Sequence, residues 1–337
     1  MSIPYRFMPW ARRGLARSHQ NKDGSNVELA VRPKINVGLT LQAKQDGKLV
    51  SPVPGNVNLT LYGPGDVIGI DQRLIVRTDP KPNITNFEPN YLAVIDFDPP
   101  DFPWLLTPAK ANANHQLRPW LVLVVLDRSI VTTPPRVKAG QPLPSISLTA
   151  EQVASELPNL AESWLWAHTQ AVLNKNDVAP DPEKETARVA AELEKDPALN
   201  VSRLVCPRRL QPRKDYLACV VPAFEVGRMR GLGQPLPPTM TTLTPAWTKG
   251  QDRELPVYYH WEFSTGPVGD IETLARRLKT PQQYQEQYQG DTERLKQLGH
   301  IGEQPVAVDA DHLLFAGQTP ETTVFEGAMV SLNFNPA

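Results

Sequence analysis

Proline is the residue that most constrains this chain, because it occupies 35 of 337 positions, about twice its usual ~5% share. Each proline fixes φ and removes a backbone donor, so it interrupts both helices and the interior strands of a sheet. We therefore expect short elements joined by stiff, ordered loops. Such loops suit a protein that presents fixed contact surfaces better than one whose loops open and close.

The remaining composition is that of a globular chain, with 40% hydrophobic residues, 21% charged residues and a formal net charge of −1. These values argue against a disordered acidic tail and against a generally basic nucleic-acid binder. The longest apolar run, 120–126, is far shorter than the ~20 residues of a bilayer helix. The N-terminus lacks the apolar centre of a secretory signal. We expect a soluble, cytoplasmic protein.

Alternating apolar residues bounded by glycine and proline predict antiparallel strands. The run at 120–126 is apolar throughout and predicts a central strand buried on both faces. The other strand patterns lie at 35–42, 48–50, 57–63, 73–77, 91–97, 201–207, 215–224, 255–266, 306–309, 312–317 and 329–334.

Helical patterns begin only after residue 147. Thr149 and Gln152 have the spacing of a capping box at the start of the first pattern. Proline precedes or opens the next two helices, as is typical of a helix N-terminus. The four predicted helices cover 148–157, 159–173, 182–195 and 269–280.

These patterns predict an α+β protein: a β-rich mixed fold with antiparallel sheets, a helical insertion and many proline-rich ordered loops. Four segments follow from the shifts in pattern. They are an N-terminal arm (1–30), a β-rich domain (31–146), the helical insertion (147–200) and a mixed α/β part (201–337) that packs on the first domain.

Tests for catalytic, metal-binding and cofactor motifs fail. The sequence has no G-x-S-x-G, and its histidines are too far apart for H-E-x-x-H. Cys206 and Cys219 form no C-x-x-C, so we expect no structural zinc; whether they are paired or are free buried thiols stays open. The glycine-rich stretch 63–69 contains Pro64 and precedes a strand, which predicts a tight turn with glycines at positive φ rather than a phosphate loop. We expect no catalytic residue, metal or cofactor.

The segment 87–110, FEPNYLAVIDFDPPDFPWLLTPAK, combines acidic residues, prolines and aromatics. Asp96 and Asp98 would project from one face of a strand end. There they could hold a divalent cation, or blunt an exposed edge and cap the Pro-Pro turn. Trp104 is either a rigid aromatic anchor of an interface or a residue of the core.

Candidate interface residues come from three segments. The N-terminal arm supplies a basic cluster around a tryptophan, and arms of this kind often order only against a partner. The acidic segment supplies a stiff aromatic turn. The loop at 208–214 supplies basic residues, which protein contact or solvent explains better than nucleic acid. The candidates are Trp10, Arg12, Arg13, Phe102, Trp104, Arg208, Arg209 and Arg213.

Six phrases between about residues 60 and 280 resemble a family encoded in gene clusters for contractile injection systems, the phage-tail-like particles of bacteria. The phrases are LYGPGDVIGIDQRLIVRTDP, FEPNYLAVIDFDPPDFPWLLTPA, LRPWLVLVVLD, LPNLAESWLWAH, SRLVCPRRLQPRKDYLACVVPAFEVGRMRGLG and YYHWEFSTGPVGDIETLARRL. The resemblance implies a structural accessory of the particle at or near its baseplate. It also implies baseplate, sheath or tube proteins as partners, and six copies or a multiple of three around the tail axis.

In photosynthetic bacteria such particles can sit on thylakoid membranes, so the resemblance further implies an indirect membrane contact. Two alternatives to a particle subunit stay open. A carboxylate-dependent hydrolase would gather its residues around one concave pocket; its candidates are Asp96, Asp98, Asp101, His115 and His260. A carbohydrate- or surface-binding module would expose a row of tryptophans; its candidates are Trp104, Trp120 and Trp261.

Overall fold

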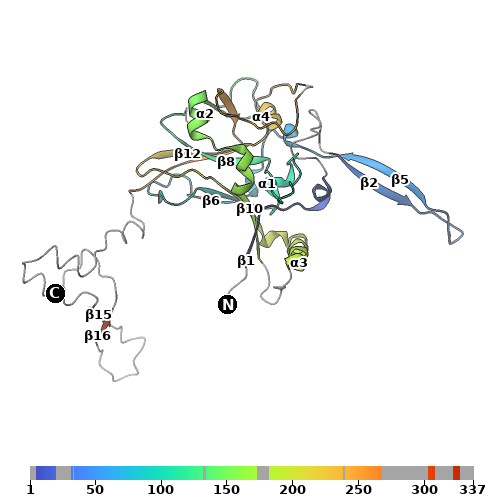
Figure 1. Cartoon of the computed structure of the whole chain (residues 1–337), viewed down its shortest axis with the longest axis horizontal. Coiled ribbons are helices and arrows are strands. Elements are labelled where there is room, and N and C mark those ends of the chain that lie inside the picture. The colour runs from blue at the N-terminus through green and yellow to red at the C-terminus, as the bar shows by residue number, and fades with distance from the viewer. Residues whose placement is uncertain are drawn as a thin grey trace, which may run out of the picture. The chain divides into compact units, whose positions relative to one another are not determined.

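The structure is a computed structural model, and it describes residues 5–19, 32, 34–131, 134–172, 182–237, 240–267, 303–307 and 322–326. The chain divides into two compact units, Met1–Val268 and Gly269–Ala337, drawn in Figure 1. The segment boundaries predicted at 30, 146 and 200 all fall inside the first unit. In the second unit, β15 (Glu303–Ala307) and β16 (Thr322–Glu326) form an antiparallel hairpin.

Strand β15 overlaps the strand predicted at 306–309. The predicted helix at 269–280 and the predicted strands at 312–317 and 329–334 lie outside the described residues.

A five-stranded antiparallel sheet collects strands from distant parts of the first unit. One face of it buries apolar side chains such as Ile95, Phe97 and Leu204 in the main core. The expected β-rich α+β fold with antiparallel sheets is thereby confirmed. In order across the sheet, the strands are β1 (Tyr5–Met8), β10 (Ala167–Val172), β11 (Val201–Val205), β7 (Val94–Phe97) and β6 (Ile75–Asp79).

A second sheet has the order β14 (Tyr259–Ser264), β12 (Asp215–Pro222) and β8 (Leu121–Asp127), and all its pairs are antiparallel. Strand β8 is buried along almost its whole length, as its apolar sequence predicts. Its predicted central position is wrong, because β12 occupies the centre of the sheet and β8, among the strands that the structure describes, pairs only with β12. A two-stranded sheet joins β9 (Ser145–Leu148) to β13 (Arg253–Pro256).

Aromatic side chains connect the two larger sheets inside one core. Phe97 of β7 lies 4.8 Å from Phe102 between ring centroids, and Phe102 lies 5.7 Å from Trp120, just before β8. The indole of Trp120 donates to the carbonyl of Phe102 at 2.8 Å, so its buried N–H is satisfied. This aromatic chain continues to Tyr258, 5.4 Å from Trp120.

The α-helices are short and lie between the strands: α1 (Phe102–Leu105), α2 (Ala150–Glu156), α3 (Pro182–Lys195) and α4 (Glu225–Gly231). The predicted capping box at the start of α2 is confirmed. Thr149 Oγ1 accepts from the Gln152 amide at 3.3 Å, and Gln152 Oε1 accepts from the Thr149 amide at 2.9 Å. Among the described residues, no helix is long and apolar enough to cross a bilayer.

The helix predicted at 159–173 is wrong. The segment forms a short 3-10 helix, Leu160–Trp166, and then strand β10. The inward positions of β10 are small residues, Ala167, Thr169 and Ala171, which give little hydrophobic alternation in the sequence. Hydrogen bonding to β1 and β11 on both sides overrides the helical pattern. The other 3-10 helices among the described residues are Gly14–Ser18, Pro64–Asp66, Gln72–Leu74 and Pro197–Leu199.

A long two-stranded hairpin projects from the rest of the first unit, as Figure 1 shows. Its strands are β2 (Lys34–Leu41) and β5 (Val53–Thr60), and β3 (Lys44–Gln45) and β4 (Lys48–Leu49) extend it to the tip. The tip turns at Asp46 and Gly47, whose φ angles are 49° and 77°. Asp-Gly is the dipeptide that favours this two-residue turn, since both residues must take positive φ. We call residues 34–60 the projecting hairpin.

Candidate functional site

The projecting hairpin has one apolar face and one polar face. Residues directly opposite each other on β2 and β5 share a face. The pairs Ile35–Leu59, Val37–Val57 and Leu41–Val53 are all apolar. On the other face, the side-chain amide of Asn36 donates to the side-chain oxygen of Asn58 at 2.8 Å. The alternation that predicted a half-buried sheet is therefore present in the structure.

What the sequence did not predict is that the described residues leave most of this apolar face uncovered. Only Ile35, at the base, is buried. Exposure rises outward, from 41% at Val57 and 44% at Leu39 to 60% at Val53 and 67% at Leu41. An amphipathic strand pair that exposes its apolar face over its outer half is a candidate interaction surface.

Each strand of the projecting hairpin is also hydrogen-bonded on one side only among the described residues. Its outer edges therefore carry backbone N–H and C=O groups with no strand partner, which other proteins avoid or protect. A lone two-stranded hairpin is marginal in water, because one cross-strand ladder buries little surface. Packing against another surface would remove both problems.

The root of the projecting hairpin is fixed to the body. Arg32, just before β2, forms an ion pair with Asp66 at 2.8 Å, so the two ends of the hairpin are tied together. Arg230 of α4 donates to the carbonyl of Gly65 at 2.7 Å. At Gly227 of α4, an added Cβ would lie 3.3 Å from Pro64, so the glycine permits this close approach.

The glycine-rich stretch 63–69 is thus the anchoring turn of the projecting hairpin. The predicted tight turn is present, but the prediction of positive φ is wrong: Gly63 has φ −128°, and neither Gly65 nor Gly69 has a positive φ. Space is the better explanation for Gly65, since a Cβ there would lie 3.3 Å from Leu236. A small cleft of about 210 Å³ lies beside this turn; it is lined by Arg32, Asp66, Val226, Arg230, Leu236 and Thr242 among others.

The basic cluster of the N-terminal arm binds this chain's own body. Trp10 donates its indole N–H to the carbonyl of His115 at 2.9 Å. Arg12 donates to the carbonyls of Thr107 and Ala109 at 3.1 and 2.6 Å, and burial lowers the pKa of its guanidinium to about 10. The arm was predicted at 1–30, and the expectation that it orders only against a partner is wrong for its described part, 5–19, because carbonyls of the 107–115 loop bind Trp10, Arg12 and His19. Residues 1–4 and 20–30 of the predicted arm lie outside the described residues.

Arg13 and the aromatic turn meet at a buried carboxylate. Asp101 accepts from the backbone N–H and the Nε of Arg13 at 3.1 and 3.2 Å. Phe102 and Trp104 follow it in α1 and belong to the core; Trp104 is 0% exposed and donates to the carbonyl of Leu117 at 3.2 Å. Of the two roles left open for Trp104, the core is the one observed. Phe102 and Trp104 are therefore removed as interface candidates.

The carboxylate of Asp96, near the end of β7, is paired with two arginines. Asp96 accepts from Arg203 on β11 at 2.6 and 2.8 Å and from Arg77 on β6 at 3.2 Å. Asp96 lies inside the sheet, so its predicted role at an exposed edge is wrong; Asp98, after the strand, is exposed. Among the described residues, no three His, Cys, Asp or Glu side chains converge on a metal-sized site.

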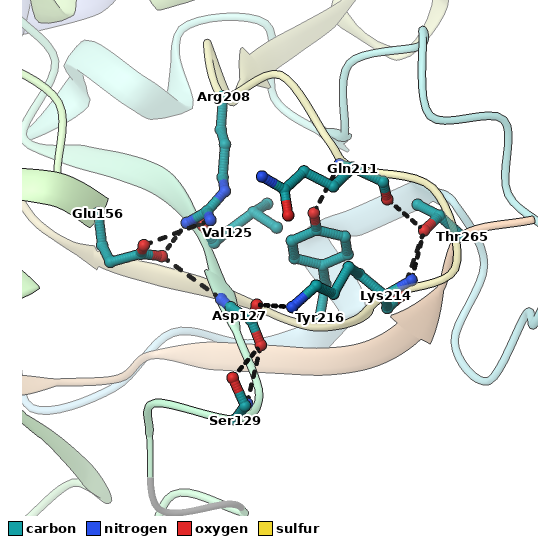
Figure 2. A network of polar contacts seen from close by, with 9 residues as sticks. All are labelled: Val125, Asp127, Ser129, Glu156, Arg208, Gln211, Lys214, Tyr216 and Thr265. Carbon is teal, nitrogen blue, oxygen red and sulfur yellow. Dashed lines mark hydrogen bonds and ion pairs between the residues drawn. The ribbon is translucent and has the colours of Figure 1, made fainter. Parts of the chain in front are cut away.

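Figure 2 shows how the basic loop 208–214 is secured. Arg208 forms an ion pair with Glu156 of α2, donates to the carbonyl of Val125 at 3.1 Å, and lies over the ring of Tyr216. Lys214 pairs with Asp127 at 3.1 Å. Burial would raise the pKa of Asp127, but hydrogen bonds from Ser129 and Lys214 hold it below its ordinary value.

The rest of this network closes the loop on itself. The Tyr216 hydroxyl accepts from the Gln211 amide at 2.7 Å, and Thr265 Oγ1 donates to the carbonyl of Gln211 at 2.6 Å. Arg208 is therefore a structural residue. Arg209 and Arg213 are exposed, and their side chains make no ion pair with a described residue, so they stay candidates for contact with a partner.

The candidate residues of the hydrolase and of the surface-binding module do not gather at one described cleft or exposed surface. His115 is exposed at a turn, while His260 on β14 is half-buried, which lowers its pKa. Neither the histidines nor the acidic candidates line the cleft beside Gly65. Trp120 and Trp261 are buried, like Trp104.

Cys206 and Cys219 are free and buried, which settles the question of their pairing. Burial raises the pKa of Cys206 to about 11 and raises that of Cys219 further. Both thiols are therefore protonated and unreactive in the folded chain.

Comparisons of the chain with models of known protein families, with characterised proteins and with solved structures found no match. The projecting hairpin is therefore identified as the candidate site from its structure and not from a relative. The sequence did contain one unused signal for it: Asp46-Gly47 between two alternating runs marks the tip of a hairpin.

Proposed function

We propose that this chain is a non-enzymatic structural subunit of a contractile injection particle, at or near the baseplate, and that it acts through protein–protein contacts. The observation that carries the proposal is the projecting hairpin, whose apolar face and free strand edges have no partner among the described residues. A rigidly anchored, amphipathic β-hairpin is a device for attachment to another protein. The resemblance of residues 60–280 supplies the kind of assembly.

The chemistry of the hairpin favours a protein over a lipid as its direct partner. In hydrocarbon, each unpaired N–H or C=O of an open strand edge costs several kcal/mol, because no water or strand satisfies it. On a protein surface, the same edges stay at a wet rim or pair with another strand. Attachment to a thylakoid or other membrane would accordingly be indirect, through the particle, and the chain would work in the cytoplasm inside the assembly.

The two alternatives have less support. A hydrolase needs a base and an acid at one concave site, but Asp96 and Asp101 are each engaged by arginine and face no cleft described above. A surface-binding module needs exposed aromatic side chains, but Trp104, Trp120 and Trp261 are 0%, 0% and 3% exposed.

The proposal is tested by purifying intact particles from cells that express the tagged full-length chain. Tube, sheath or baseplate proteins should co-purify with the wild type. The double variant Leu41→Glu/Val53→Glu should co-purify at least about tenfold less, because two carboxylates would have to be desolvated at the contact. Thr40→Glu adds a charge to the opposite, polar face and should co-purify normally.

Recovery of the tagged chain without any particle protein would overturn the proposal. Deletion of residues 1–20 is a poorer test, since it removes β1, Arg12 and Arg13 and would destabilise the body itself.

A further inference from the structure

We propose that the projecting hairpin of one copy packs, through its apolar face, on the outer face of β1 and β10 of a second copy. The contact would join copies head to tail. This inference rests on the proposed function for its setting in a particle, and it names the partner of the hairpin as this same chain.

The acceptor surface is an apolar end of the five-stranded sheet. Tyr5 and Phe7 lie two residues apart on β1, so they share a face, and they are 48% and 63% exposed. Val172 of β10 lies opposite Tyr5 and extends this face. We call Tyr5, Phe7 and Val172 the β1 patch.

The other face of the same strands is already covered inside each copy. Met8 of β1 and Ala171 of β10 pack with Ala11 and with Val189 and Leu193 of α3. Helix α3 therefore occupies the inner face at this end of the sheet, and the outer face with the β1 patch has no cover among the described residues.

The projecting hairpin matches the β1 patch in shape and chemistry. The hairpin is two-stranded, and so is the end of the sheet where Ala171 and Val172 pair with β1. The apolar face of the hairpin would meet Tyr5, Phe7 and Val172, and the polar Gln170 and His168 on the same outer face would border the contact. Aligned packing of two such faces gives a β-sandwich contact, which buries Leu41 and Val53 against Tyr5 and Phe7. Exposed apolar area is removed from water on both sides, whereas docking on a polar surface would desolvate the partner without that gain.

Charge complementarity points to the same pairing. Lys44 and Lys48 lie at the tip of the hairpin, beyond its apolar strip. Near the Tyr5 end of β1, Asn200 accepts from the Val172 amide at 2.9 Å and donates to the carbonyl of Asp196 at 2.7 Å. Asn200 thus links Asp196, an exposed residue, to the end of β10 that carries Val172, and the tip lysines of a docked hairpin would reach this end.

The contact has to come from a second copy. Figure 1 shows the projecting hairpin pointing away from β1, so the two surfaces of one chain do not meet. Since the two surfaces differ, the contact is heterologous, and repetition of it closes a ring or extends a filament. This symmetry is the kind that a subunit arranged around a tail axis requires.

Sedimentation of the purified full-length chain over a concentration series tests the inference. The wild type should associate in a concentration-dependent way. Leu41→Glu/Val53→Glu, which lacks the donor face, and Phe7→Glu, which lacks the acceptor patch, should each bind themselves at least about tenfold more weakly. Thr40→Glu and Val137→Glu, at exposed positions outside both surfaces, should associate like the wild type.

Mixing the two variants tests whether the contact is head to tail. The hairpin of Phe7→Glu is intact, and so is the β1 patch of Leu41→Glu/Val53→Glu, so an equimolar mixture should form 1:1 dimers that neither variant forms alone. Failure of the mixture to associate, with an associating wild type, would overturn the inference. Association of Phe7→Glu alone, as strong as that of the wild type, would also overturn it and would indicate a hairpin-to-hairpin contact.

A wild type that stays monomeric at the highest concentration would also overturn it. Binding of that monomer to anionic lipid vesicles would assign the hairpin to a membrane instead. Co-purification of the chain with particle proteins would leave the proposed function standing in either case, so the two proposals fail separately.

Discussion

Arg13 and Asp101 lie 88 residues apart in the sequence and form a doubly hydrogen-bonded contact, in which the backbone N–H and the Nε of Arg13 donate to the two oxygens of one carboxylate. The side chain of Asp101 is 2% exposed, whereas that of Arg13 is 23% exposed. The contact fastens the N-terminal segment to the turn that begins α1.

Loss of the two partners should have unequal effects. Arg13→Leu leaves a buried carboxylate without its cation and should lower the free energy of unfolding by about 2–4 kcal/mol. Asp101→Asn leaves a guanidinium that can reach water and should cost about 1–2 kcal/mol. Urea unfolding followed by circular dichroism measures both. Arg73→Ala, in the exposed Asp71–Arg73 pair, is the control and should have no measurable effect.

Trp104 should be among the most sensitive positions of the core. Trp104→Ala removes a fully buried indole and should cost about 3–5 kcal/mol. Trp104→Phe keeps most of the volume but leaves the Leu117 carbonyl without its donor, so about 1–2 kcal/mol is expected. Leu165→Ala, at a 57% exposed site, should change stability by less than about 0.5 kcal/mol in the same measurement. Equal effects at Trp104 and Leu165 would contradict the assignment of Trp104 to the core.

Substitution by alanine should have different effects on the thermal midpoint at two glycines. At Gly231 a Cβ would lie 2.6 Å from two atoms of the Pro256 ring, which forces α4 away from β13. Gly231→Ala should therefore lower the thermal midpoint. Gly55 in β5 has no atom within 4 Å of its added Cβ and no positive φ, so Gly55→Ala should be neutral or slightly stabilising. Scanning calorimetry distinguishes the two outcomes.

Stability should fall as the pH is lowered through the histidine range. Burial lowers the pKa of His19 below its ordinary value of 6.5; the Pro108 carbonyl opposes this shift, and Arg12 adds to it. The unfolded chain then binds more protons than the folded chain below 6.5. The stabilising contribution is complete above pH 6.5 and is lost as the pH falls from there through the lower, folded pKa.

This pH dependence can be measured as the urea midpoint between about pH 7.5 and about pH 5.5, above the ordinary range of carboxylates. His19→Gln keeps a donor for the Pro108 carbonyl and should make the dependence shallower. His168 and His260, whose pKa values are also lowered mainly by burial, account for the dependence that remains. If the urea midpoint of His19→Gln depends on pH as steeply as that of the wild type, His19 does not contribute to the pH dependence.

The projecting hairpin should be dispensable for folding of the body. Asn36 and Asn58 lie opposite each other, so residues 37–57 can be replaced by Asn-Gly, which closes a two-residue turn. The shortened chain keeps Ile35, Leu59 and the Arg32–Asp66 pair, and its thermal midpoint should stay within a few degrees of the wild type. A large loss of stability would mean that the hairpin packs on its own body.

Local patterns in the sequence predicted the elements whose cause is local. The capping box of α2, the proline at the start of α3 and the apolar run of β8 are each decided by neighbouring residues, and each is present. The order of strands is not local: β8 carries the most apolar sequence, yet β12 takes the centre of the sheet. Strand β10 was missed because pairing with β1 and β11, which are distant in sequence, decides its conformation.

The site was harder to predict than the fold for a related reason. Alternation in β2 and β5 shows that one face is apolar but does not say what covers it. Tryptophan and arginine are good interface residues in general, yet Trp104, Arg12 and Arg208 all found partners within the chain. Exposure is a property of the whole packing arrangement, so the aliphatic residues Leu41 and Val53 were overlooked.

The ion pair of Arg32 and Asp66, which ties together the two ends of the projecting hairpin, has a consequence for the evolution of this chain. Under the proposed function, mutations on the outer half of the projecting hairpin would alter attachment without disturbing the core, while mutations in the core would alter folding without changing the side chains that attach. Affinity and stability can therefore drift under separate selection. A change of binding specificity needs only a few exchanged side chains in one short stretch of sequence.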